Sequence, residues 1–334
     1  PYNDIIRKFI DMYAGRLRNQ VSFMLSACNF YMPIFEEALD AYGLPLELRY
    51  LPIIESALNP SAVSRAGASG LWQFMIGTGK IYGLESNSLV DERRDPIKAT
   101  WAAARYLKEM YDIYGDWNLV IAAYNCGPGT INKAIRRANG ETDYWKIYNY
   151  LPKETRGYVP AFIAANYVMT YYCDHNICPM ETNIPASTDT VQVNQNLHFE
   201  QIADLCNVPL DQIKSLNPQY KKQMIPGDSK PYTLRLPIDA ISTFIDKQDT
   251  IYAHRADELF RNRKTVTVKD ITPATRKTTS AVAGKGNLTY HTIKSGDTLS
   301  TIAGKYGVTI KDIQRWNGMS STKIAAGKRL KIYK

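Results

Sequence analysis

The sequence predicts an α+β protein of several domains, in which a mainly helical region is followed by two small βααβ units. The 334 residues are enough for two or three domains, and a hydrophobic content of 45% is typical of folded protein. Helical periodicity dominates up to about residue 180. Beyond it, short strand-like and helical pieces alternate in an order that occurs twice.

Start and stop signals define several helices of the N-terminal region. Asp95 and Pro96 provide an N-cap and a first-turn proline for one helix, which Gly115 ends. Asp116 is expected to cap the next helix, and Thr130 the one after it. Residues 59–83, by contrast, are punctuated by glycine, serine and alanine, which predicts irregular structure of the kind that displays functional groups.

The repeated βααβ unit is about 45 residues long. Its first copy is expected to gain an extra helix at its C-terminal end. The stretch between the copies is rich in Thr, Lys and Ala and has no apolar period, which indicates a flexible linker. The sequence therefore predicts four parts: a helical domain over 1–180, a first unit over 187–260, a linker over 261–288 and a second unit over 289–334.

The net charge of +9 lies entirely in the C-terminal part of the chain. Acidic and basic side chains balance in residues 1–180, so residues 181–334 carry the excess. An anionic partner is expected, and on charge alone it could be nucleic acid, an acidic membrane surface or an anionic cell-wall polymer. No apolar stretch approaches ~18 residues, so no transmembrane helix is expected. Because the chain starts at Pro1 without a signal pattern, any export signal or membrane anchor is expected in a segment outside it.

The five cysteines are too sparse for a disulfide framework. Only Cys173 and Cys178 are close enough in sequence for a local bridge, and we expect a short loop with buried or bridged thiols there. His175 lies between them, but a fourth ligand at a recognisable spacing is missing. We therefore expect no metal site.

Glu55 is an acidic residue in an apolar pattern. If the segment is helical, Leu51, Ile54 and Leu58 form a stripe, and Glu55 falls within it. Burial raises the pKa of a carboxyl group, and an acid that stays protonated near neutral pH can act as a general acid. The alternative is a glutamate at a helix end that reaches water or a salt bridge. By pattern alone this alternative is favoured, because Pro52 makes the helical register uncertain.

Five motifs shift the balance toward a functional acid. They are Leu51–Ser56, Gly67–Met75, Asp91–Pro96, Ala122–Asn125 and Glu154–Val159. Their order and spacing resemble those of the lysozyme-like lytic transglycosylases of bacterial cell walls, of the membrane-bound murein transglycosylase D type. The resemblance covers most of residues 30–175 and implies a mainly α, lysozyme-like catalytic domain.

By this resemblance, Glu55 is the single catalytic acid/base. Ser64 and Gln73 match residues that hold the substrate beside it, and Met75 matches a residue that lines the sugar groove. Ile76 stands where the family usually has proline, which affects the shape of the loop and not the chemistry.

Three further positions follow from the same resemblance. Tyr124 matches a tyrosine that orients the catalytic group, and Asn125 matches its binding partner. Glu154 matches a carboxylate on the far side of the cleft. Cys126 replaces the small residue that usually follows the asparagine, again with no loss of a reacting group.

A single acid also has a chemical consequence. Ordinary glycosidases use two carboxylates, roughly 5–5.5 or 6.5–9.5 Å apart. No second carboxylate accompanies Glu55 in the motifs, and Glu85 and Asp91 have charged neighbours that indicate a structural ion network. A lone acid suffices if the substrate's own C6 hydroxyl attacks the anomeric carbon, which closes a 1,6-anhydro ring. No metal or organic cofactor is needed.

The second βααβ unit contains the segments Tyr290–Leu299, Ile302–Ala303 and Trp316–Asn317. With these segments it resembles a LysM module, a small binder of N-acetylglucosamine chains. It implies that the sugar lies between two loops, contacting Gly296, Asp297, Thr298, Leu299, Lys323 and Ile324. Asp297 is also expected to cap the helix that starts at Thr298. In the first copy Asn196–Leu197 replaces the expected motif, so we expect its fold without much sugar affinity.

The expected function is cleavage of the β-1,4 bond between N-acetylmuramic acid and N-acetylglucosamine in peptidoglycan glycan strands. The implied setting is the periplasmic side of a bacterial cell envelope, with attachment to the outer membrane, and the chain is expected to be a monomer. A lysozyme-type muramidase that uses water and a non-catalytic peptidoglycan-binding scaffold remain as alternatives. Nucleic-acid binding has no support beyond charge, so no nucleic-acid partner is expected.

Overall fold

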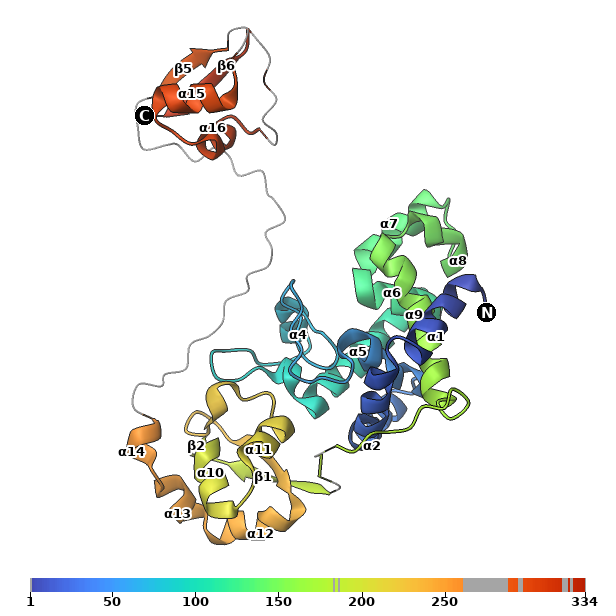
Figure 1. Cartoon of the computed structure of the whole chain (residues 1–334), viewed down its shortest axis with the longest axis vertical. Coiled ribbons are helices and arrows are strands. Elements are labelled where there is room, and N and C mark those ends of the chain that lie inside the picture. Colours follow the sequence, from blue (N-terminus) through green and yellow to red (C-terminus); the bar gives the residue numbers. More distant parts are fainter. Residues whose placement is uncertain are drawn as a thin grey trace. The chain divides into compact units, whose positions relative to one another are not determined.

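A computed structural model of the chain describes residues 2–182, 184–185, 187–260, 288–293, 297–319, 324 and 327–333. The chain forms two compact units, Pro1–Asp270 and Ile271–Lys334. Both contain helices and short antiparallel strand pairs, and the whole is mainly helical (Figure 1). The predicted α+β, multidomain fold class is confirmed.

The helical region is the N-terminal part of the compact unit Pro1–Asp270. Its core contains the fully buried Phe35, Trp72 and Leu107, and the indole nitrogen of Trp72 donates to Thr100 Oγ1 at 2.9 Å. The first and last helices of the region, α1 and α9, lie along one another (Figure 1). In order, the helices are α1 (Asp4–Ala14), α2 (Arg18–Ala41), α3 (Leu51–Ser56), α4 (Ile76–Ile81), α5 (Pro96–Tyr114), α6 (Trp117–Cys126), α7 (Pro128–Arg137), α8 (Tyr144–Ile147) and α9 (Lys153–Thr170).

The helix boundaries follow from local capping. Asp95 accepts hydrogen bonds from the first backbone N–H groups of α5, and Gly115, with a φ of +62°, ends that helix. Asp116 accepts from Leu119 N and caps α6. These three predictions are confirmed. The prediction for Thr130 is wrong: α7 already begins at Pro128, since a proline is favoured at the first helical position.

The first βααβ unit contains one more strand pair than expected. Strands β1 (Thr188–Val193) and β4 (Tyr232–Pro237) pair antiparallel around α10 (Phe199–Cys206) and α11 (Leu210–Leu216). The additional pair is β2 (Asn196–His198) with β3 (Met224–Pro226). The predicted extra helix is three short ones, α12 (Ile238–Asp246), α13 (Gln248–Ala253) and α14 (Ala256–Leu259). We call residues 187–260 the first module.

The compact unit Ile271–Lys334 contains the second βααβ unit. Strand β5 (Leu288–Thr292) pairs antiparallel with β6 (Arg329–Tyr333), and α15 (Leu299–Tyr306) and α16 (Ile310–Trp316) lie between them in sequence. The expected linker falls almost wholly on residues 261–287, outside the described residues, and its last position, Leu288, lies in β5.

The internal repeat is visible in matching hydrogen bonds at an offset of 100 residues. Asn217 Oδ1 accepts from the backbone N–H of Arg235 at 2.8 Å in the first module. Asn317 Oδ1 accepts from the backbone N–H of Lys331 at 2.7 Å in the second unit. In both copies the asparagine ties the end of the second helix to the last strand.

Three further expectations concern thiols, metals and membranes. Cys173 and Cys178 are exposed and unbridged, which corrects the expectation of buried or bridged thiols. Within the described ranges, no group of three or more His, Cys, Asp or Glu side chains is arranged to hold a metal ion. None of the helices in those ranges combines the length and apolarity needed to cross a membrane.

Candidate active site

Glu55 lies in the last turn of α3 and is half-buried. The helix ends at Ser56, because Ala57 and Leu58 adopt left-handed backbone conformations with φ of +51° and +57°. The expected stripe is therefore wrong in part: Leu58 is buried, but it does not continue the helix of Glu55. What buries the carboxyl group is the surrounding fold and not a continuous helical face.

The electrostatic environment keeps Glu55 close to neutrality. Burial raises the pKa of its carboxyl group to about 7, the hydrogen bond from Tyr158 lowers that pKa, and the charge of Glu154 raises it. The Tyr158 hydroxyl donates to Glu55 Oε1. A carboxyl group with this pKa can both give and accept a proton near neutral pH.

Tyr124 and Tyr158 divide the tasks that the resemblance gave to Tyr124 alone. The Tyr124 hydroxyl donates to the backbone oxygen of Trp72 at 2.7 Å, whereas Tyr158 is the tyrosine that holds Glu55. Burial and the charge of Glu55 raise the pKa of both hydroxyls well above the usual value. Sequence reasoning did not single out Tyr158, because it lies in an apolar run that reads as helix core, although it belongs to the fifth motif.

A cavity of about 440 Å³ opens at Glu55. The predicted residues Ser64 and Gln73 line it together with Glu55. Tyr13 in α1 and Leu17, just before α2, also line it, and no motif pointed to them. The N-terminal helices therefore contribute directly to the wall of the site.

The loop that carries Ser64 and Gln73 is fixed by its own hydrogen bonds. Gln73 has a left-handed backbone, with a φ of +49°, and its side-chain amide donates to Gly70 O at 2.8 Å and Ala62 O at 3.2 Å. Ser64 Oγ accepts from Ala68 N at 3.0 Å. Strain of this kind persists where the surrounding structure determines the conformation.

Three predicted residues lie elsewhere. Met75 is half-buried just before α4, and Asn125 Oδ1 accepts from Thr155 Oγ1 at 2.9 Å. Glu154 is exposed in the first turn of α9 and acts on Glu55 through its charge. None of the three is among the described residues that line the cavity.

The expected ion network is present in the segment 85–95. Asp91 pairs with Arg93 at 2.8 Å, and Glu85 with Lys230 at 2.7 Å. Glu92 pairs with Lys98 at 2.5 Å. These acids are engaged with cations away from the cavity, and Glu55 is the acid among the described residues that line it.

The second unit places its predicted sugar contacts in several ways. Asp297 Oδ2 lies 2.9 Å from His291 Nε2, and Thr298, not Asp297, caps α15. Leu299 is a buried core residue, and Ile324 packs half-buried against the same core. Gly296 and Lys323 lie outside the described residues.

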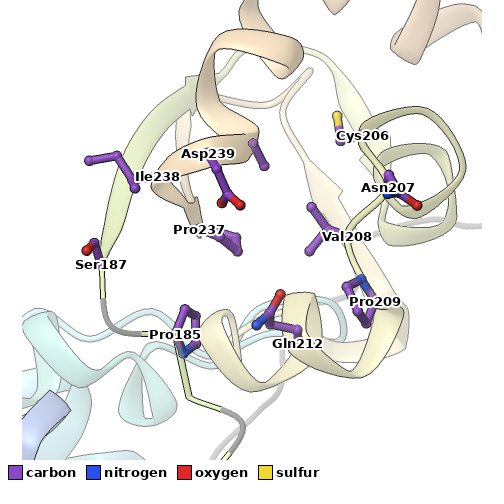
Figure 2. A pocket seen from close by; sticks show the side chains of 11 residues that line it. Pro185, Ser187, Cys206, Asn207, Val208, Pro209, Gln212, Pro237, Ile238 and Asp239 are labelled. Carbon is purple, nitrogen blue, oxygen red and sulfur yellow. The ribbon is translucent and has the colours of Figure 1, made fainter.

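A hollow of about 570 Å³ lies in the first module, between the α10–α11 connection and the start of α12 (Figure 2). Asp239 and Gln212 are among its lining side chains (Figure 2). Asp239 is exposed, so it lacks the burial that raises the pKa of Glu55. The hollow therefore does not offer a second acid of the same kind.

Comparisons with known proteins give a consistent result. Family models match in three places: the transglycosylase SLT domain over residues 32–147, the LysM-like domain of lytic transglycosylase MltD over 187–253, and the LysM domain over 291–332. The 70-kDa soluble lytic transglycosylase of Escherichia coli has a solved structure that matches with a TM-score of 0.38 and 29% identity, covering 43% of this chain and 24% of that one.

Two curated relatives are similar in sequence. The soluble lytic murein transglycosylase of Escherichia coli K12 is 33% identical over 124 residues, which are 35% of this chain and 19% of that protein. The membrane-bound lytic murein transglycosylase D of Escherichia coli K12 is 31% identical over 336 residues, which cover 99% of this chain and 69% of that protein. The chain therefore belongs to the family of membrane-bound lytic murein transglycosylase D.

Proposed function

We propose that this protein is a peptidoglycan lytic transglycosylase that cleaves the β-1,4 bond between N-acetylmuramic acid and N-acetylglucosamine and leaves a 1,6-anhydro-N-acetylmuramic acid end. The observation that carries the proposal is the environment of Glu55. This carboxyl group is half-buried, bonded to Tyr158, raised in pKa to about 7 and placed in one cavity with Ser64 and Gln73. Membership of the family supports the same activity.

The reaction needs one proton donor that later becomes a proton acceptor. Protonated Glu55 gives its proton to the leaving glycosidic oxygen, while the substrate's N-acetyl group stabilises the positive anomeric carbon. The carboxylate of Glu55 then takes the proton of the C6 hydroxyl as that oxygen bonds to the anomeric carbon. Because the nucleophile belongs to the substrate, its effective concentration is high, and no water needs to be positioned.

The remaining site residues are proposed to bind the sugars or to support the site. Ser64 and Gln73 hold the substrate beside Glu55, and Met75, which does not line the cavity at Glu55, is proposed to line the sugar groove outside it. Tyr124 supports the chain at Trp72, and Asn125 supports the start of α9 through Thr155. Glu154, which is exposed, tunes Glu55 through its charge. The catalytic domain is proposed to span 1–180.

The C-terminal half is proposed to keep the enzyme at its polymer. A polysaccharide substrate and a place in the cell envelope agree with the family and with the LysM match over 291–332. We propose that the LysM module of residues 288–334, joined to the rest of the chain by a linker over 261–287, binds glycan strands. The excess of basic residues in 181–334 suits the carboxylates of murein peptides. A periplasmic monomer, attached to the outer membrane by a segment outside this chain, completes the proposal.

Mass spectrometry of the products from purified murein tests the function. The wild-type protein is expected to release anhydro-ended fragments, which are lighter by one water than hydrolysis products. Glu55→Gln should abolish cleavage. Glu47→Gln is the matched control, because Glu47 is an exposed acid close in sequence to Glu55, and it should cleave as the wild type does. Products of hydrolysis would favour the muramidase alternative, and cleavage by Glu55→Gln would place the acid elsewhere.

A further inference from the structure

The segment 85–95 of the helical region is built into the first module. Leu89 and Val90 are buried in the same hydrophobic core as Tyr220 of that module. Val90 forms an antiparallel β-bridge with Tyr220, and the backbone N–H of Lys221 donates to Leu89 O at 2.6 Å. The contact therefore combines core packing with main-chain hydrogen bonding.

Polar side chains close the same junction. Lys221 Nζ donates to Asn87 O at 2.9 Å and lies 3.8 Å from Asp91 Oδ2. The Tyr232 hydroxyl lies 3.0 Å from each carboxylate oxygen of Glu85. Asp91 is only 1% exposed, and burying a carboxylate is costly unless cations such as Lys221 lie close to it. The junction is thus a polar network with a buried centre, in which, among the residues that the structure describes, Ser86 Oγ and Gln219 Oε1 are the buried side-chain atoms without a hydrogen-bond partner.

Asp91 connects this junction, through Arg93, to the loop that carries Ser64 and Gln73. It forms two parallel hydrogen bonds of 2.8 Å with Arg93, which is also buried. Arg93 Nη1 in turn donates to Gly67 O at 2.8 Å and to Phe74 O at 3.0 Å. These two oxygens lie on either side of the turn that leads to Gln73. A rigid guanidinium in a bidentate pair fixes the geometry of the groups that it bonds.

We propose that the first module is a positioning element for the substrate-binding loop of residues 62–75, acting through Lys221, Asp91 and Arg93, and not a second wall anchor. Lys221 of the module binds the segment 85–95, and Arg93 of that segment binds the loop. This inference rests on the proposed function, because the loop is the part that carries Ser64 and Gln73.

The module's own loops support this assignment. Strands β2 and β3 join the loop before α10 to the loop before β4. Asn196 donates to Asp228 through its backbone N–H at 3.0 Å and its side-chain amide at 2.5 Å, and the adjacent Leu197 is fully buried. The resemblance of the second unit places its sugar between the corresponding loops. In the first module these two loops are hydrogen-bonded to each other, so their polar groups are already engaged.

Steady-state kinetics of the full chain on soluble murein fragments tests the proposal with Lys221→Ala. We expect KM to rise about tenfold with kcat within about twofold, because the loop binds the sugar without reacting with it. Lys221→Arg should restore most of the loss, since it keeps the charge beside Asp91. Lys214→Ala is the matched control, because Lys214 is another lysine of the module and pairs with the exposed Asp211. Hydrogen exchange of the amides in 62–75 should be faster in Lys221→Ala alone.

Tyr232→Phe is a second, milder variant that removes only one hydroxyl from the junction. We expect KM to rise about threefold. Wild-type kinetics in both variants would overturn the proposal. So would weaker sedimentation with insoluble murein at unchanged KM, because that result makes the module an anchor; sedimentation is measured in a Glu55→Gln background, where the polymer stays intact. Either result leaves anhydro products and dependence on Glu55 in place, so the failure of this inference is distinct from failure of the proposed function.

Discussion

The hydroxyl of Tyr158 donates a hydrogen bond to the carboxylate of Glu55 across 103 residues of sequence. Tyr158 lies in the long helix α9 and Glu55 in the short helix α3, and the two helices pack together. The bond favours the charged form of the acid, whereas burial favours the neutral form. The balance between the two sets the pKa at about 7, and several predictions depend on it.

The first prediction concerns the pH dependence of the wild-type enzyme. Because Glu55 must be protonated to begin the reaction, kcat/KM should fall as pH rises through about 7, tenfold for each further unit. The measurement is initial cleavage of soluble murein fragments between pH 5 and 9. A rate that stays constant up to pH 9 would contradict Glu55 as the acid with this pKa.

Tyr158→Phe should move the alkaline limb of that profile to higher pH. Removing the hydroxyl takes away the hydrogen bond that lowers the pKa of Glu55. It should also reduce kcat by about 10- to 100-fold, because the carboxyl group loses its orientation. Tyr167→Phe is the matched control, since Tyr167 lies in the same helix with an exposed side chain. A lower kcat with an unmoved limb would assign Tyr158 to orientation alone.

Glu55→Gln should stabilise the protein at alkaline pH. With a folded pKa of about 7 and an ordinary value of 4.5, the native state of the wild type binds the proton more tightly than the unfolded chain. The contribution of Glu55 to the stability of the wild type therefore decreases as pH rises from about 4.5 to 7. At pH 8 the variant should gain on the order of 2–3 kcal/mol in free energy of unfolding, and at pH 4 the difference should vanish. Urea unfolding at both values measures this, and an equal gain at both would refute the ionic cause.

Local signals in the sequence were sufficient for several helix boundaries. Asp95, Gly115 and Asp116 act within one turn of their own position, so a pattern of a few residues identified them. Thr130 failed because a competing local signal, the proline at 128, starts the helix earlier. The same holds for Asp297, where the adjacent Thr298 takes the capping position.

Contacts between segments that are distant in sequence could not be predicted from local patterns. Tyr158 reads as core because nothing in its neighbourhood indicates that its hydroxyl meets Glu55. Strands β2 and β3 were missed because three residues are too few to show a period of two. The pairing of Val90 with Tyr220 joins two segments of different predicted domains, so no local pattern encodes it. The motifs indicated the acid, Glu55, whereas the tertiary structure was needed to locate the residues that support it.

Gly70→Ala should be among the most damaging substitutions in the substrate loop. Gly70 has a φ of +89°, and a Cβ atom there would lie 1.7 Å from the backbone oxygen of Arg93. The loop would have to move away from Arg93, at a cost of about 3 kcal/mol or more. Gly67→Ala is the control, because Gly67 has the same φ but no atom within 4 Å of an added Cβ, and it should cost only about 1–2 kcal/mol. Equal unfolding free energies for the two variants would show that the close approach is unimportant.

Deleting residues 288–334 should weaken binding to insoluble murein and leave the cleavage of soluble fragments unchanged. The deleted part falls within the compact unit Ile271–Lys334, whereas the residues that line the cavity at Glu55 all belong to the compact unit Pro1–Asp270. A linked module raises the local concentration of the enzyme at the polymer without touching the reacting bond. Binding is measured by sedimentation in a Glu55→Gln background, so that digestion does not release the protein. Unchanged sedimentation of the shortened chain would remove the LysM module from the binding mechanism, whereas slower cleavage of soluble fragments would mean that the module takes part in the reaction itself.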